Sequence, residues 1–251
     1  MRTSFSQNNM FVQCSKAWYW QYIEGYYSEM EGSSLYFGTA IDRAVSDMLE
    51  NNPDWLKTFH NAWEYQSKDG KGARLFDHSA ITYSHKDMDF DLLAPQDYLE
   101  LEKWAKELKL INTMTTTTNQ QLADLFKTCS KAKSNPYIKI TDEQFKYFNR
   151  CSWLGLKRKG EILLKSFDEQ VRPKITKVVS TQKRSEITDP ITGDQIVGYV
   201  DMILELQGYD KPIIFDLKTS AKPYEQHQLD VSPQFGGVYM QLWKLKSIIL
   251  T

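Results

Sequence analysis

Two carboxylates and a lysine fall on neighbouring β-rich stretches, at a spacing that suits hydrolysis assisted by a metal ion. Asp201 ends the run Gly-Tyr-Val-Asp at positions 198–201, and Asp216 and Lys218 follow 15 and 17 positions later. Because side chains alternate along a strand, Asp216 and Lys218 point to one face while Leu217 points into the opposite layer. If the two strands form a hairpin, Asp201 lies beside this pair.

Together these groups would make an oxygen-rich site. The carboxylates of Asp201 and Asp216, with the main-chain carbonyl of Leu217, suit a hard divalent cation, Mg²⁺ or Mn²⁺. A cation held there activates water and neutralises charge on a phosphodiester, and Lys218 can orient or deprotonate that water. The predicted reaction is phosphodiester hydrolysis. The alternative interpretation is a salt bridge among Asp201, Asp216 and Lys218 at a strand end, which an isolated Asp-x-Lys pattern favours.

Three strands are expected to position the site. Residues rich in β-formers predict a meander, with strands at 175–181, 195–206 and 213–219. Residues 189–194 have the composition of a turn between the first two. After the meander we expect a helix at 233–246 and the start of a further strand at 247–251.

Helices are expected on both sides of Pro53. Aromatic residues recur at three- and four-residue spacing between positions 5 and 27, which predicts a buried amphipathic helix, and a second helix is expected at 40–49. Residues 53 to about 170 predict a helical insertion, most periodic at 97–110 and 142–167. The 251 residues fit a single domain, 1–251, that carries this insertion. The fold class is therefore α/β, with a central mixed sheet flanked by helices.

Composition excludes several classes of protein. The fractions of hydrophobic (41%) and charged (25%) residues match ordinary globular proteins and argue against a disordered or fibrous chain. No apolar run approaches the roughly 18 residues that span a bilayer, so we expect no membrane partner. Three cysteines without Cys-x-x-Cys spacing indicate a reducing, intracellular setting. The four histidines add no zinc-ligand spacing.

Basic charge is concentrated in one segment, which we call the basic segment, from Lys127 to Arg184. It contains 15 Lys and Arg against 5 Asp and Glu, a net charge of +10, whereas the rest of the chain has a net charge of −11. Aromatic residues interleave with these cations, a combination that suits a phosphate backbone and unstacked bases. The densest basic stretch predicts DNA contacts at Lys157, Arg158 and Lys159. A solvated helix face with buried aromatics is the alternative, and the sequence leaves both open.

The arrangement Gly-x-x-Asp, followed 15 positions on by Asp-x-Lys-Thr-Ser, resembles the PD-(D/E)XK nuclease superfamily and, within it, the RecB-like exonuclease branch. Residues 4–16 look like the opening helix of that branch, and residues 36–42 look like its Phe-Gly-x-x-Ile-His motif. Asp42 stands where the family usually places a metal-binding histidine, and the resemblance implies that Asp42 is a further ligand. Residues 218–223 look especially like phage exonucleases and the mitochondrial genome maintenance exonuclease. The fold that this implies is a restriction-endonuclease-like core.

The resemblance also implies DNA contacts and the absence of one cofactor. Gln234 and Tyr239 are similar to the family's Gln-x-x-x-Tyr motif, with the tyrosine one place late, and Lys222 is a further candidate for a phosphate contact. Cys14 falls at the first place of the four-cysteine iron-sulfur cluster that some members bind. No cysteine follows Cys151, so no iron-sulfur cluster is expected.

We therefore expect a divalent-metal-dependent deoxyribonuclease. The resemblance favours an exonuclease that acts on DNA with a free or single-stranded end, in replication, recombination or repair, located in the cytoplasm or in the host cytoplasm if phage-encoded. One alternative is a catalytically inactive nucleic-acid-binding module of the same fold, because Asp42 replaces the histidine. Another is a structural subunit of a recombination or replication complex, whose basic segment would meet an acidic partner protein.

Overall fold

The structure is a computed structural model that describes residues 2–28, 30–63, 81–114, 117–188, 193–218 and 247–250. The chain divides into two compact units. The sheet unit comprises Met1–Glu29, Leu49–Asn51 and Phe167–Thr251, and the helical unit comprises Met30–Met48 and Asn52–Ser166. Every residue of the Asp201, Asp216 and Lys218 constellation belongs to the sheet unit.

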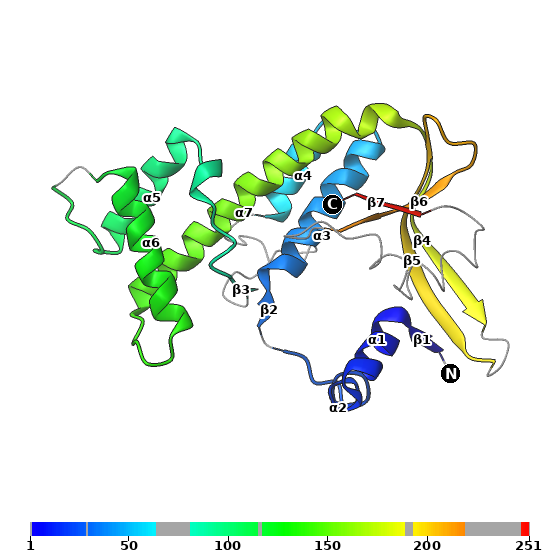
Figure 1. Ribbon diagram of the computed structural model, residues 1–251, viewed down its shortest axis with the longest axis horizontal. Coiled ribbons are helices and arrows are strands. Elements are labelled where there is room, and N and C mark those ends of the chain that lie inside the picture. Colours follow the sequence, from blue (N-terminus) through cyan, green and yellow to red (C-terminus); the bar gives the residue numbers. More distant parts are fainter. Residues whose placement is uncertain are drawn as a thin grey trace. The chain divides into compact units, whose positions relative to one another are not determined.

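The sheet unit contains a five-stranded mixed sheet. Strands β4 (Ile175–Thr188), β5 (Gln195–Leu206) and β6 (Ile213–Leu217) are antiparallel neighbours in chain order, whereas β1 (Arg2–Ser4) pairs parallel with β5 and β7 (Ser247–Leu250) pairs parallel with β6 (Figure 1). The predicted meander is confirmed, as is the terminal strand. The predicted helix at 233–246 and most of the predicted turn at 189–194 lie outside the described residues. The α/β class with a mixed sheet and helices is likewise confirmed.

β5 is the strand on which this sheet is built. It pairs with β4 along one edge, and its other edge is shared by β1, at residues 195–197, and β6, at residues 202–204. Its residues 202–204 are buried in succession, as are residues 213–215 of β6. Strands covered on both faces have such continuous apolar runs. One cover is Phe167, near the end of α7 (Asp142–Gln170), whose ring meets the ring of Phe215 edge-on at 6.2 Å.

The opening helix departs from its prediction. Ser4 caps α1 (Phe5–Gln13) in a capping box with Gln7, but the backbone of Cys14 is extended (φ −158°) and ends the helix. Cys14 then caps α2 (Ser15–Trp18), which is followed by a π-helix, η1 (Tyr19–Ile23). No residue of these two short helices is buried. The prediction of one buried amphipathic helix was therefore wrong, because the aromatic periodicity continues across a break in the backbone and its rings stay accessible.

The helical unit is built around α3 (Ser33–Leu49, its last residue in the sheet unit), α4 (Trp55–Ala62) and residues 142–166 of α7. α3 begins at Ser33, seven residues before its predicted start. α5 (Pro95–Glu107) and α7 confirm the two most periodic predictions, and α6 (Asn119–Ser134) lies between them in the chain. Short elements complete the described chain: β2 (Glu31–Gly32), β3 (Ile81–Thr82), η2 (Phe90–Leu92) and, in the sheet unit, η3 (Arg172–Lys174).

Close aromatic packing holds the helical unit together. Phe37 of α3 meets the rings of Phe59 and Trp63 edge-on, and Phe126 of α6 stacks on Phe148 of α7 at 5.3 Å. A Cβ atom at position 160 of α7 would overlap the ring of Phe59, so only glycine permits this approach of α4 to α7. None of the described helices combines the length and the apolar character needed to cross a bilayer.

Candidate functional site

The hairpin of β5 and β6 brings Asp201 next to the strand that carries Asp216. The two strands are antiparallel and Met202 pairs with Phe215. The residue before Met202, Asp201, therefore lies opposite the residue after Phe215, Asp216. Oδ2 of Asp201 accepts a hydrogen bond of 3.2 Å from the main-chain N–H of Leu217. The juxtaposition expected from the sequence is confirmed, and this hydrogen bond fixes one oxygen of Asp201 beside β6.

Asp216 is the most buried charged group of the site. Its side chain is 1% exposed, and Oδ2 lies 2.7 Å from Nζ of Lys218, which is 33% exposed. This contact is an ion pair, and among the described residues neither carboxylate oxygen of Asp216 has a hydrogen-bond partner. A buried carboxylate without donors is costly, and its cost falls when it is paired with a cation. The ion pair named by the alternative interpretation therefore exists between Asp216 and Lys218.

The donor set fits a hard cation in kind. Two carboxylates from adjacent strands and the carbonyl of the half-buried Leu217 are oxygen donors, and a cation would supply the oxygens of Asp216 with a partner beyond the ion pair with Lys218. Within the described ranges, no three or more His, Cys, Asp or Glu side chains gather in a group that could hold a metal ion. A role for Leu217 as a ligand stays a prediction.

Gln182 on β4 completes a row across the sheet and was missed by sequence reasoning. Its neighbours Thr181 and Lys183 pair with Met202 and Val200, so Gln182 lies opposite Asp201. Its backbone is left-handed, with φ of 46°, within a strand. Such a conformation costs a residue other than glycine about 1–2 kcal/mol, and strained residues of this kind cluster at functional sites. The residue types around position 182 do not predict this left-handed backbone.

Other predicted site residues lie elsewhere in the chain or outside the described part. Asp42 lies half-buried on α3 of the helical unit, whereas Asp201, Asp216 and Lys218 are in the sheet unit, so its role as a metal ligand stays a prediction. The predicted DNA contacts Lys222, Gln234 and Tyr239 lie outside the described residues.

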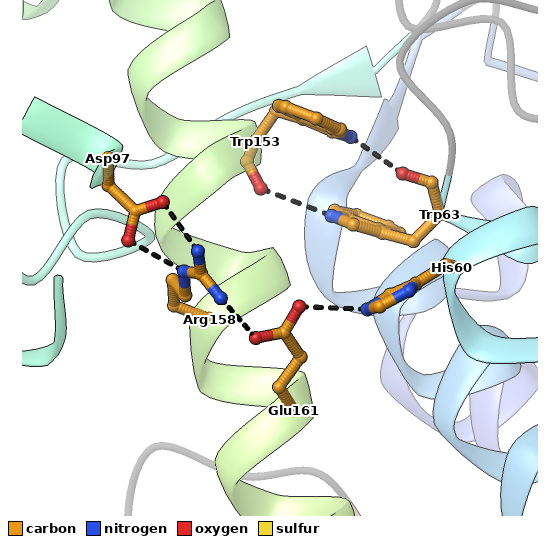
Figure 2. Close-up of polar contacts among 6 residues, drawn as sticks. All are labelled: His60, Trp63, Asp97, Trp153, Arg158 and Glu161. Atoms are coloured by element: carbon orange, nitrogen blue, oxygen red, sulfur yellow. Dashed lines mark hydrogen bonds and ion pairs between the residues drawn. The ribbon is translucent and has the colours of Figure 1, made fainter. Parts of the chain in front are cut away.

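Arg158 has a structural role within the helical unit. Its guanidinium donates to both oxygens of Asp97 on α5, at 2.6 and 2.7 Å, and to Glu161 at 2.5 Å (Figure 2). Hydrogen bonding to Asp97 and then to Glu161 raises the pKa of Arg158. Glu161 in turn lies 2.8 Å from Nε2 of His60 on α4. This chain of polar contacts thus joins α4, α5 and α7, and a DNA contact by Arg158 stays a prediction.

Reciprocal tryptophan contacts strengthen the same junction. The indole N–H of Trp63 donates to the carbonyl of Trp153 at 3.1 Å, and the indole of Trp153 donates to the carbonyl of Trp63 at 2.7 Å (Figure 2). On the same helix, Lys157 and Lys159 are half-exposed, with Nζ of Lys157 5.5 Å from the ring centre of Trp153. These two lysines keep the exposure that a phosphate contact needs.

The basic segment shows features of both interpretations. Tyr147 and Phe148 are buried in the core of the helical unit, as the alternative holds, whereas Tyr137 is 95% exposed. Lys133 is committed to the fold: its Nζ donates to the carbonyl of Tyr83 at 2.5 Å and lies 4.3 Å from the centre of the Phe148 ring. Burial lowers the pKa of Lys133. Tyr147 and Phe148 therefore serve packing, whereas Tyr137 remains accessible to a ligand.

Comparisons of the chain with family models, with curated proteins and with solved structures found no match.

Proposed function

We propose that the protein is a divalent-metal-dependent DNA nuclease, in which Asp201 and Asp216 bind Mg²⁺ or Mn²⁺ and Lys218 acts on the attacking water. The observation that carries the proposal is the buried carboxylate of Asp216, whose two oxygens lack hydrogen-bond partners among the described residues. It lies opposite a second carboxylate, Asp201, on the adjacent strand. Like charges directly opposite each other destabilise a sheet. A cation bound between the two carboxylates would offset their repulsion.

Each side chain has a distinct task in this proposal. The hydrogen bond from the main-chain N–H of Leu217 to Asp201 holds one of the two carboxylate ligands in place. The bound cation supplies an activated water and offsets negative charge on the phosphate. Lys218 is 33% exposed and near Asp216, so its amine can reach both solvent and the site. In that position it can orient the water or take its proton.

The topology supports the finer fold. An opening helix, three antiparallel strands in chain order and a last strand parallel to the third form a mixed sheet with helices, which is compatible with a restriction-endonuclease-like core. The resemblance to RecB-like exonucleases adds the preference for DNA ends and a place in replication, recombination or repair. Half-exposed Lys157 and Lys159 offer contacts to the phosphate backbone.

One observation favours a second candidate, a nucleic-acid-binding module without catalysis. Lys218 already lies within 2.7 Å of Asp216 and neutralises it without a metal ion. In such a module the ion pair is structural and the sheet has lost its cation. Asp42, in place of a histidine, is consistent with this loss.

The deciding experiment is degradation of end-labelled single- and double-stranded DNA, and of a closed circle, with Mg²⁺ or Mn²⁺. The native chain is compared with Asp216→Asn and Lys218→Ala. Lys211→Ala, which removes an exposed lysine from the loop between β5 and β6, is the matched control. We expect cleavage by the native chain and the control only, with the circle spared. Equal DNA binding by all four proteins without cleavage would establish the binding module instead.

A further inference from the structure

The surface formed by residues 5–27, here called the aromatic segment, is richer in exposed rings than the rest of the chain that the structure describes. It contains 8 Phe, Trp and Tyr among its 23 residues, whereas 13% of the whole chain is aromatic. Five of these rings belong to residues at least 45% exposed: Phe11, Tyr19, Trp20, Tyr26 and Tyr27. An exposed apolar patch of this kind marks an interaction site.

Contacts within the segment hold the rings. Phe11 meets Trp18 edge-to-face at 5.3 Å, and Trp20 meets both Tyr19, at 5.9 Å, and Tyr26, at 5.5 Å, in the same manner. The hydroxyl of Tyr19 donates to Glu24 at 2.6 Å. The rings are therefore organised by one another rather than by a core, so little ordering is needed when a ligand binds them.

The composition of the segment fits nucleic-acid bases better than a partner helix. It contains no leucine and only one valine and one isoleucine, so rings dominate its apolar side chains. It does contain five amide side chains, which both donate and accept hydrogen bonds: Gln7, Asn8, Asn9, Gln13 and Gln21. Rings that stack and amides that pair with base edges are the two features by which proteins hold unpaired bases.

The segment is attached to the strand that carries Asp201. β1 directly precedes α1 and pairs with Gln195, Ile196 and Val197 on β5, four residues before Asp201. α1 also lies against β5. On the edge of β5 that β1 occupies, residues 198–201 separate the stretch paired with β1 from the stretch paired with β6. A ligand on the aromatic segment is therefore held in the same compact unit as the candidate metal site.

We infer that the aromatic segment is a stacking surface for unpaired bases, so that the substrate of the proposed site is single-stranded nucleic acid. That this nucleic acid is a substrate rests on the proposed function, whereas the binding of bases to the aromatic segment does not. Every base has a π-face, so this surface binds without strict sequence preference. Because stacking releases few counterions, its contribution persists at salt concentrations that weaken phosphate contacts.

The test measures binding by fluorescence anisotropy in EDTA, where no metal-dependent cleavage occurs. The probes are a labelled 20-nucleotide oligo(dT) and an abasic strand of the same length, which keeps the phosphates and lacks the bases. We expect the native chain to bind oligo(dT) at least 10-fold more tightly than the abasic strand, with the ratio maintained from 50 to 200 mM salt, as stacking on one or two rings provides.

Variants assign the effect to the segment. Trp20→Ala with Tyr26→Ala should lower the affinity for oligo(dT) at least 10-fold and leave the affinity for the abasic strand unchanged. Tyr209→Ala removes an exposed tyrosine elsewhere in the sheet unit and should change neither. Trp20→Leu with Tyr26→Leu keeps apolar volume without planar rings, and it provides the same comparison if the alanine variant does not fold, as judged by circular dichroism.

Equal affinity of the native chain for the two strands would overturn the inference, and so would unchanged binding by both double variants. If the variants instead convert an oligomer into a monomer in sedimentation while oligo(dT) binding persists, the segment is a protein interface and the inference fails. Base-dependent binding without cleavage in any metal would sustain the stacking surface and overturn the proposed nuclease. Cleavage together with equal binding of the two strands would support the proposed nuclease and overturn the stacking surface.

Discussion

The carboxylate of Asp201 on β5 accepts a hydrogen bond from the main-chain N–H of Leu217 on β6, at 3.2 Å. One oxygen of Asp201 thus serves the fold, and in the proposed function the charge of the carboxylate serves the cation. The two uses can be separated by substitution, since asparagine retains the carbonyl oxygen that accepts the bond but loses the charge.

We predict that Asp201→Asn folds with a stability within about 0.5 kcal/mol of the native chain but binds Mn²⁺ at least 100-fold more weakly, because a hard cation requires carboxylate charge. Asp201→Ala should lose the metal and also destabilise the sheet by about 1 kcal/mol, through loss of the hydrogen bond. Urea unfolding and isothermal titration with Mn²⁺ measure the two effects. Equal Mn²⁺ affinity in the native chain and Asp201→Asn would exclude Asp201 as a ligand.

Asp216→Asn should increase stability in the absence of metal, by about 1 kcal/mol, while abolishing cleavage. The substitution removes a charge whose side chain is 1% exposed, and it leaves Lys218 able to extend into water. Thermal unfolding in EDTA measures the stability. A loss of stability in this variant would show that the ion pair serves the fold, as the structural interpretation holds.

Lys218→Ala should destabilise the metal-free protein by about 2 kcal/mol. This is less than the roughly 3–5 kcal/mol of a fully buried pair, because Lys218 is one-third exposed. Saturating Mn²⁺ should restore the loss by supplying the missing positive charge to Asp216, with a gain of about 2.7 kcal/mol at 100 times the dissociation constant. The control is Lys211→Ala, which should show no such rescue. Absence of rescue would count against a cation at Asp216.

Gln182→Gly should stabilise the protein, whereas Gln182→Ala should not. Glycine adopts a φ of 46° without the clash of a Cβ, so Gln182→Gly should gain about 0.5–1 kcal/mol, whereas Gln182→Ala keeps the strain and gains nothing. If Gln182 also serves catalysis, both variants lose turnover while their stabilities diverge. Equal stability of the two variants would refute the strain.

The three cysteines should differ sharply in reactivity. Cys14 is exposed, whereas Cys129 and Cys151 are buried, and burial raises the pKa of Cys129 to about 11 and that of Cys151 well above its ordinary value. A raised pKa leaves less of the reactive thiolate at pH 8. Iodoacetamide should therefore modify Cys14 rapidly and the two buried cysteines slowly. Peptide mass spectrometry identifies the site. Rapid modification of Cys129 or Cys151 in the folded protein would contradict their burial.

Several elements of the sheet unit follow from the sequence because they depend on local patterns. The bounds of β5 and the meeting of Asp201 with Asp216 come from alternation and from a short connection between two β-rich runs. The early start of α3 at Ser33 does not, because Gly38 is a poor helix former that the pattern places before a helix. Packing around Phe37 overrides that local preference.

The sequence does not show whether a periodic set of side chains faces the core or the solvent. The aromatic segment has the spacing of a buried helix, and only the extended backbone at Cys14 shows that the pattern belongs to two short helices. Arg158 likewise reads as surface charge within a basic triplet. Its partner Asp97 lies 61 positions away, and no local signal joins two residues so far apart.

Pairing between β1 and β5 also sets the order in which the chain can fold. Arg2 and Gln195 are partners separated by 193 positions, whereas the helical unit ends at Ser166. At about 5–20 residues per second, a ribosome needs roughly 10–40 s to make that interval. Throughout that time the aromatic segment has no strand against which to settle, while the helices that follow it can already pack. The candidate site is therefore assembled only after the helical unit has been synthesised, and the exposed rings of the aromatic segment are available to chaperones before the site forms.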